Sequence, residues 1–121
     1  MNKYLTLHSQ SGKRYGASCS SDQFISTPQA FLDVLAWGSE NKTNLFVLGE
    51  MNFVPQFYDL KTGLAGEVFQ KSSNYNIRLA IVGTFEMVVS ERFRELMAES
   101  NKGHQVRFAR RRDEAISWIV R

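Results

Sequence analysis

The chain has 121 residues, of which 43% are hydrophobic and 22% are charged, a composition that excludes a wholly disordered chain. Eight glycines and two prolines are too few for a collagen-like or linker-dominated protein. Fifteen Lys and Arg against twelve Asp and Glu give a mildly basic net charge of +3, and the length predicts one domain over residues 1–121.

The first predicted elements are two strands that pair as a hairpin. Residues 4–8 alternate in polarity, and a second strand covers about residues 14–19, after a segment with the composition of a turn. Ser26-Thr27-Pro28 predicts the start of a helix, because a hydroxyl side chain caps a first turn and proline fits into it. Gly38 or Asn41 is expected to end this helix.

The rest of the chain alternates between strands and helices. Strands are predicted at 45–48, 79–82 and 106–109, and helices at 60–74, from 90 to about 101, and from 113 to 120. The order β-β-α-β-α-β-α-β-α predicts an α/β fold with a five-stranded mixed sheet, an N-terminal hairpin and four helices. The later strands should be parallel, because each is joined to the next through a helix.

Glycines and capping residues give these helices expected details. Gly63 and Gly66 should lie inside the second helix, where each costs about 1 kcal/mol relative to alanine, and close packing on the sheet is the expected reason for them. Ser90 and Asp113 should cap the third and fourth helices. Gly103 suits the left-handed conformation that follows a helix.

The one cysteine, Cys19, excludes an intrachain disulfide and a cysteine-rich metal site. It falls in the second predicted strand and is expected to be a small buried residue. No apolar run approaches the roughly 20 residues of a membrane-spanning helix, and the first residues lack the apolar core of a secretory signal. These features predict a cytoplasmic protein without a membrane partner.

The order of elements resembles the STAS fold of bacterial anti-sigma-factor antagonists. Those proteins carry an acidic-x-Ser-Gly turn at the start of the second helix, and a partner kinase phosphorylates the serine. The comparable stretch here is Asp59-Leu60-Lys61-Thr62-Gly63, in which Thr62 stands where the serine stands. One extra residue separates Asp59 from Thr62, and a lysine precedes the hydroxyl. The resemblance implies phosphorylation or a partner contact at Asp59, Lys61, Thr62 and Gly63.

The physical chemistry of this turn is compatible with two roles. A phosphate at a helix N-terminus is stabilised by free N–H groups and by the helix dipole, and Lys61 could pair with it. Alternatively, Asp59 or Thr62 caps the helix.

A second resemblance extends over nearly the whole chain. Residues 57–71, 74–75, 79–83 and 99–103 resemble the core of an uncharacterised bacterial domain family. Because that family is known chiefly as a domain of unknown function, the resemblance supports a shared fold and implies no chemistry.

Several polar residues are candidates for a ligand pocket at the carboxyl end of the third strand, where ligands bind in open α/β sheets. They are Glu50, Asp59, Lys61, Glu67, Lys71 and Asn101. Glu67 and Lys71 equally suit an ion pair between residues i and i+4 of one helix.

Residues 61–121 hold eleven basic and seven acidic side chains, and Arg107, Arg110, Arg111 and Arg112 form a candidate anion patch. The same arginines also suit a solvated face near a helix start. The Lys and Arg residues as a set lack the interleaved aromatic residues of a single-strand binder, so a nucleic-acid partner is not expected. His8 and His104 lack metal-ligand spacing, so neither a metal nor a cofactor is expected.

The sequence contains no nucleophile elbow, P-loop or dinucleotide-binding motif, and no residue is assigned a catalytic role. The leading hypothesis is a non-enzymatic regulatory or protein-interaction module whose contact surface runs from Phe53 to Lys71. The alternative is a small-ligand binder or enzyme that uses the strand ends around Glu50, Asp59, Lys61 and Asn101. A regulatory protein is the expected partner, and a homodimer is a second hypothesis for the assembly.

Overall fold

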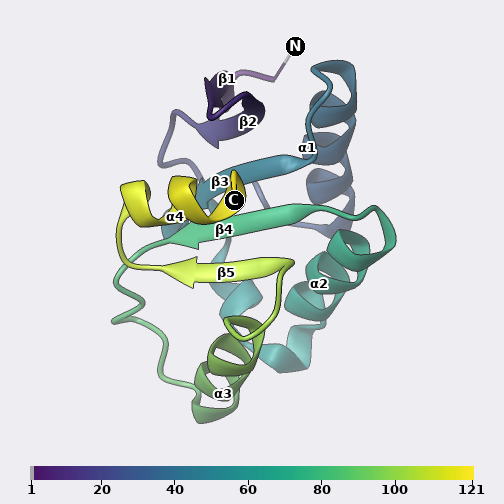
Figure 1. Ribbon diagram of the computed structural model, residues 1–121. Coiled ribbons are helices and arrows are strands. Elements are labelled where there is room, and N and C mark those ends of the chain that lie inside the picture. The colour runs from purple at the N-terminus through teal and green to yellow at the C-terminus, as the bar shows by residue number, and fades with distance from the viewer. Residues whose placement is uncertain (1) are drawn as a thin grey trace.

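The computed structural model describes residues 2–121, which form a five-stranded sheet and four α-helices (Figure 1). The elements are β1 (Leu5–Gln10), β2 (Lys13–Ser18), α1 (Pro28–Glu40), β3 (Leu45–Gly49), α2 (Leu64–Asn74), β4 (Arg78–Val82), α3 (Glu91–Ser100), β5 (Val106–Ala109) and α4 (Arg112–Ile119). The strands lie in the order β1-β2-β3-β4-β5; β1 and β2 are antiparallel, and the later pairs are parallel. The predicted mixed sheet with an N-terminal hairpin is confirmed.

The two faces of the sheet carry two apolar cores because side chains alternate along each strand. Phe46 and Leu48 of β3 face a core shared with α1, α2 and α3. Leu45 and Val47 of the same strand face the opposite core, which α4 covers with Trp118 and other side chains. Figure 1 shows α4 by itself on its side of the sheet. The continuous apolar runs of the central strands follow from this burial on both faces.

The hairpin between β1 and β2 turns through Ser11 and Gly12, whose φ angles are 54° and 76°. Two consecutive residues with positive φ are typical of a type I′ turn, which matches the twist of paired strands. β2 ends at Ser18, so the expectation that Cys19 is a buried strand residue is wrong: its side chain is exposed, and its thiol lies 3.6 Å from the carbonyl oxygen of Lys3.

Two of the predicted helix caps are confirmed. The hydroxyl of Thr27 accepts a hydrogen bond from the N–H of Ala30, and that of Ser90 accepts one from Phe93. The prediction for the fourth helix is wrong, because Arg111 occupies the cap position of α4 and Asp113 lies in its first turn.

Within residues 2–121, no helix is both long enough and apolar enough to cross a membrane.

The glycines differ from the predictions in three places. Gly63 precedes α2 with a φ of +82° and is not inside the helix. Gly66 is inside it, but it is exposed and an added Cβ would meet nothing, so close packing on the sheet is not its role. Of the two residues expected to end the first helix, Asn41 does so as predicted: α1 continues through Gly38 and is capped by Asn41. The φ of Gly103 is not positive, so the prediction of a left-handed conformation at this residue is wrong.

The outer edge of β5 is covered by side chains from the end of α3. The side-chain amide of Asn101 donates to the carbonyl of Phe108 over 3.1 Å and accepts from the Phe108 N–H over 2.8 Å. The hydroxyl of Ser100 donates to the Val106 carbonyl over 2.5 Å. At the opposite edge of the sheet, five of the six residues of β1 are exposed. The sheet therefore has one covered edge and one open edge.

Candidate functional site

The carboxyl edge of the sheet holds a cavity of about 270 Å³ between the segment that follows β3 and the loop that follows β4. Its lining residues are Gln23, Glu50, Met51, Phe53, Pro55, Tyr58, Met87 and Val88. Apolar and aromatic side chains predominate, as they do in most binding pockets. Parallel α/β sheets bind ligands at this edge, so the cavity is the first candidate for a functional site.

Asn52 fixes the backbone on one side of the cavity. Its side chain is buried, accepts a hydrogen bond from the Gly49 N–H over 2.7 Å, and donates to the carbonyls of Ser20 and Asp22 over 2.7 and 3.0 Å. One side chain thereby joins the end of β3 to the segment that follows β2. A buried amide with all three groups paired holds both segments in one arrangement.

Glu50 joins the segment after β3 to the loop after β4. Its carboxylate oxygen accepts a hydrogen bond from the backbone N–H of Phe85 over 3.0 Å. The carboxylate lies so close to Gly83 that a Cβ at that position would collide with it. Glycine at the end of β4 is therefore required for this contact between neighbouring loops.

The loop after β4 is held in an unusual conformation at Phe85, whose φ is +58°. A bulky residue with positive φ costs about 1–3 kcal/mol, so the surrounding contacts have to offset that cost. The guanidinium of Arg94 donates to the carbonyls of Phe85 and Val88 over 2.9 and 3.0 Å. The Phe85 ring is buried in the core. Glu50 and Arg94 thus hold the two sides of one short loop.

Tyr58 forms part of the cavity lining and is mostly buried. Its hydroxyl donates a hydrogen bond to the backbone carbonyl of Glu50 over 2.8 Å. Burial, and next the negative charge of Glu50, raise the pKa of Tyr58 well above its ordinary value. The phenol is consequently a neutral hydrogen-bond donor near neutral pH and does not serve as a base.

Three exposed apolar side chains lie at or beside the mouth of the cavity. Met51 and Met87 line it with exposed fractions of 59% and 85%, and Val89, which is 93% exposed, follows the lining residue Val88. Large apolar side chains gathered in this way are typical of a surface that another molecule covers.

The turn that carries the predicted contact residues is built from its own hydrogen bonds. The carboxylate of Asp59 accepts from the Lys61 N–H over 3.1 Å. The hydroxyl of Thr62 donates to the carbonyls of Gln56 and Asp59 over 2.6 and 2.9 Å, and Gly63 caps α2. The turn lies beside an open cleft of about 350 Å³, whose lining is Ser26, Thr27, Pro28, Gln56, Thr62, Gly63, Leu64 and Glu67. The starts of α1 and α2 thus meet at this cleft.

The six residues predicted to form a polar pocket are distributed over several places. Glu50 lines the carboxyl-edge cavity, and Asp59 and Lys61 lie in the turn before α2. Glu67 and Lys71 pair with each other over 2.7 Å, as the helical spacing indicated. Asn101 is bound to Phe108 at the outer edge of β5, which is two strands away from β3. The structure therefore does not bring Glu50 and Asn101 together.

The four arginines predicted as an anion patch also have separate surroundings. Arg107 donates to the carbonyl of Asn101 over 3.0 Å. Arg111 pairs with Asp113 over 2.8 Å, and this contact raises the pKa of Arg111 and lowers the pKa of Asp113. Arg110 and Arg112 are exposed at the start of α4. Arg111 already carries a carboxylate partner, which weakens any patch made of all four.

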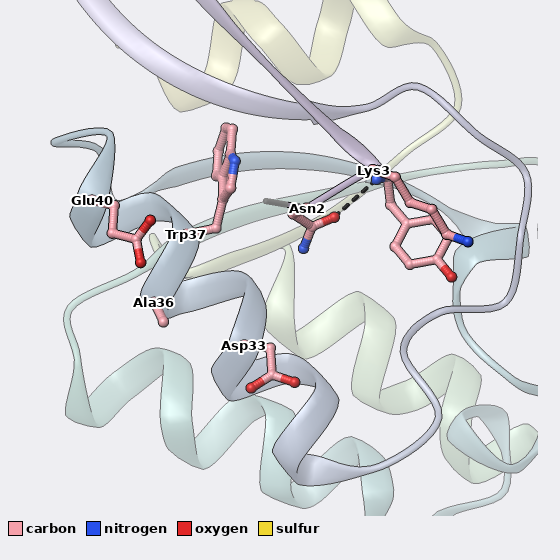
Figure 2. A pocket seen from close by; sticks show the side chains of 7 residues that line it. Asn2, Lys3, Asp33, Ala36, Trp37 and Glu40 are labelled. Carbon is pink, nitrogen blue, oxygen red and sulfur yellow. Dashed lines mark hydrogen bonds between the residues drawn. The ribbon is translucent and has the colours of Figure 1, made fainter.

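A wide hollow of about 450 Å³ lies between α1 and the start of β1 (Figure 2). Trp37 stands between Glu40 and Asp33 along α1, and the side chain of Asn2 accepts the Tyr4 N–H over 2.9 Å. The hollow is open and its sides carry Lys3 and two carboxylates.

Across residues 2–121, no group of three His, Cys, Asp or Glu side chains is arranged to hold a metal ion.

Residues 10–119 match the model of a family described as Domain of unknown function (DUF4180). The chain belongs to this family. No curated protein and no solved structure matches the sequence. The matched span includes every residue of the carboxyl-edge cavity, whereas most of β1 precedes it.

In this DUF4180 member, half of the residues that line the cavity lie outside the surfaces predicted from the sequence; they are Gln23, Met51, Met87 and Val88. Local sequence patterns offered no reason to select Asn52, Met51 or Met87. Each has its role through contacts with a segment that is distant in the sequence. One signal was present: Met87-Val88-Val89 is an apolar run in a segment predicted as a loop, where polar residues are usual. Such a run outside a helix or strand favours a binding role.

Proposed function

We propose that this domain is a non-catalytic, STAS-like regulatory module that binds a partner protein at the carboxyl-edge cavity. The observation that carries the proposal is the apolar cavity with exposed Met51, Met87 and Val89 at and beside its mouth. The STAS-like assignment is supported by the order of the strands and helices. The contact surface predicted from Phe53 to Lys71 contributes Phe53, Pro55 and Tyr58 to the same cavity.

The size of the cavity favours one side chain of a partner over a small molecule. Its volume of about 270 Å³ lies at the lower limit of the range of about 300–1,000 Å³ that is usual for small-molecule sites. A cavity of this size suits a single large apolar side chain on a protein surface. Methionines at the mouth are flexible and can adapt to such a side chain, and the exposed apolar area around it suits the core of an interface.

The backbone around the cavity is fixed before any partner arrives. Asn52 joins the segments after β2 and β3, and Glu50 and Arg94 hold the loop after β4. A preformed site has less conformational entropy to lose on binding, which improves affinity. The Tyr58 hydroxyl and the Glu50 carboxylate, which line the cavity, already have backbone partners, which supports a role in binding.

A capture experiment with matched variants tests this function. The wild-type protein, Met87→Asp and Tyr75→Ser are used as baits in extract from the source cells, and retained proteins are quantified by mass spectrometry. Tyr75 is the matched control because it is 59% exposed, caps the C-terminal end of α2 and does not line the cavity. We expect at least one protein that wild type and Tyr75→Ser retain equally and that Met87→Asp loses at least about tenfold, because a charge in an apolar contact is poorly solvated.

The result that would contradict the proposal is equal retention of every bound protein by the three baits, with all three melting at similar temperatures. Purified candidates are then titrated against wild type and Met51→Asp, since Met51 lines the other side of the mouth. Direct binding that Met51→Asp does not weaken would place the contact elsewhere on the domain.

Phosphorylation of Thr62 stays a prediction, and the geometry makes it testable. The residue is exposed, but its hydroxyl donates to the carbonyls of Gln56 and Asp59, so a phosphoryl group on the oxygen would remove both hydrogen bonds. It would also add negative charge beside the start of α2. Thr62→Glu in the same capture experiment should change the retained partner; unchanged retention would count against a switch at this residue.

A further inference from the structure

The amino edge of the sheet, opposite the carboxyl-edge cavity, holds a cleft of about 720 Å³. We call it the amino-edge cleft. Its lining residues are Gly12, Lys13, Arg14, Lys42, Thr43, Asn44, Leu45, Arg78, Ile119 and Arg121. They come from the β1–β2 turn, the turn before β3, the start of β4 and the end of α4. Four segments that are distant in the sequence therefore meet around one space.

Five of the ten lining residues have basic side chains, and none has an acidic side chain: Lys13, Arg14, Lys42, Arg78 and Arg121. The ion pairs found within residues 2–121 involve Lys71, Lys102 and Arg111, none of which lines the cleft. One third of the fifteen basic residues of the chain thus surround one space without a carboxylate side chain among its walls. Clefts lined by one sign of charge concentrate ions of the opposite sign.

Backbone carbonyls hold part of this charge in place. The ammonium of Lys13 and the guanidinium of Arg78 both donate to the main-chain oxygen of Arg121, the last residue of the sequence, over 3.3 Å. Arg78 also donates to the carbonyls of Ile119 and His104 over 3.1 Å, and its guanidinium lies 4.3 Å from the centre of the Trp118 ring. Two positive groups thus already converge on one oxygen atom.

The positive charges in the cleft oppose one another. Burial lowers the pKa of Arg78, and the positive charge of Arg121 lowers it further. The Lys42 ammonium is exposed on a turn residue with a φ of +59°. A bound anion would relieve this repulsion, whereas water only screens it.

We propose that the amino-edge cleft binds a small oligophosphate anion, with phosphate oxygens contacted by Lys13, Arg14 and Lys42. A volume of about 720 Å³ falls within the range of about 300–1,000 Å³ for small-molecule sites. Five cations can neutralise several phosphate groups, and Lys and Arg are the side chains that bind phosphate through charge-assisted hydrogen bonds. The proposal is independent of the partner site, because it concerns the opposite ends of the strands.

Isothermal titration calorimetry of the whole chain with sodium pyrophosphate and sodium tripolyphosphate tests the site. We expect one binding event, tighter for tripolyphosphate, that weakens when the salt concentration is raised from 50 to 300 mM. Lys13→Ala and Lys42→Gly should each weaken binding about tenfold, the effect of losing one charge-assisted hydrogen bond. Because Lys42 has positive φ, glycine should be accommodated there without loss of the fold.

The matched control is the double variant Arg110→Ala with Arg112→Ala, which removes two exposed cations that do not line the cleft. It should bind tripolyphosphate as wild type does. Absence of binding at 50 mM salt, or equal weakening by the control and by the cleft variants, would overturn the proposal.

A third titration separates the oligophosphate from a nucleic-acid backbone. A duplex DNA of about 20 base pairs and a single-stranded RNA are added under the same conditions. Binding of either polymer without binding of tripolyphosphate would overturn a small-molecule site, because a surface that contacts a polymer backbone does not require a site that fits one small anion. Circular dichroism of each variant verifies that the loss of binding is not a loss of folding.

Discussion

Tyr58 links the titration of one residue to the stability of the fold. In the unfolded chain its phenol loses a proton near the ordinary pKa of 10.0, whereas in the folded domain burial and Glu50 keep the proton on the hydroxyl. Above that pH the unfolded state binds fewer protons than the folded state. The contribution of Tyr58 to the free energy of unfolding is therefore complete below pH 10 and falls as the pH rises above it.

The variant Tyr58→Phe should lose about 1 kcal/mol of stability at pH 7, because it removes the hydrogen bond to the Glu50 carbonyl. It should also lose less stability than wild type between pH 9 and pH 11. Urea denaturation at each pH measures both effects, with Tyr75→Phe as the exposed control. Equal pH dependence in wild type and Tyr58→Phe would show that the phenol titrates normally in the folded domain.

At the scale of elements, two glycines in helices should respond oppositely to alanine. Gly66 in α2 is exposed, and an added Cβ meets nothing, so Gly66→Ala should raise the free energy of unfolding by about 0.5–1 kcal/mol. Gly38 in α1 is buried, and an added Cβ would collide with the Phe46 ring and approach the Thr43 carbonyl oxygen to 2.7 Å. Gly38→Ala should therefore destabilise the domain by about 1–3 kcal/mol.

Urea denaturation of both variants beside wild type measures the two effects. A stability loss in Gly66→Ala would mean that α2 packs closely on another surface at that residue. No loss in Gly38→Ala would mean that α1 can move away from β3 without cost.

The elements that the sequence predicted correctly are those with strong local patterns. The apolar runs at 45–48 and 79–82 indicated buried strands, and the hydroxyls of Thr27 and Ser90 indicated helix starts. These signals depend on neighbours within a few residues. The same local reasoning failed for Gly66, because helical spacing does not show which side of the helix faces the sheet.

The sites required information that local patterns do not contain. Met51 and Met87 line the same cavity only because β3 and β4 are adjacent in the sheet. The basic residues of the amino-edge cleft did leave a signal: Lys13 and Arg78 begin strands, and Lys42 comes three residues before one. Because the starts of parallel strands lie at one edge of the sheet, basic residues at several strand starts predict a cluster of positive charge at that edge. The cluster Arg107–Arg112 was more conspicuous in the sequence, but part of it is paired with Asp113.

At the scale of the whole molecule, the sheet presents two chemically different ends. The carboxyl edge offers an apolar cavity, and the amino edge offers a cationic cleft. The strands between them keep the two surfaces apart, so the proposed protein partner and the proposed small anion would occupy separate sites. Variants at one end are therefore suitable controls for measurements at the other.

The unequal edges of the sheet limit how copies of this chain can add to one another. Asn101 and Ser100 occupy the backbone groups of β5, whereas in β1 the type I′ hairpin leaves those of Leu5, Leu7 and Ser9 directed outward. Two copies joined antiparallel through β1 would place Leu7 beside its counterpart on a two-fold axis. Both β1 edges would then be used, so growth would stop at a pair and no filament could form.

Sedimentation velocity over a wide concentration range should consequently show monomers and dimers without larger species. Leu7→Lys should shift the population toward monomer, because lysine on an edge strand opposes pairing. A continuous series of larger assemblies would mean that Asn101 does not terminate the sheet. A chain with one open sheet edge can pair with one other copy only. It therefore avoids the unlimited strand-to-strand assembly that is open to a protein with two exposed edges.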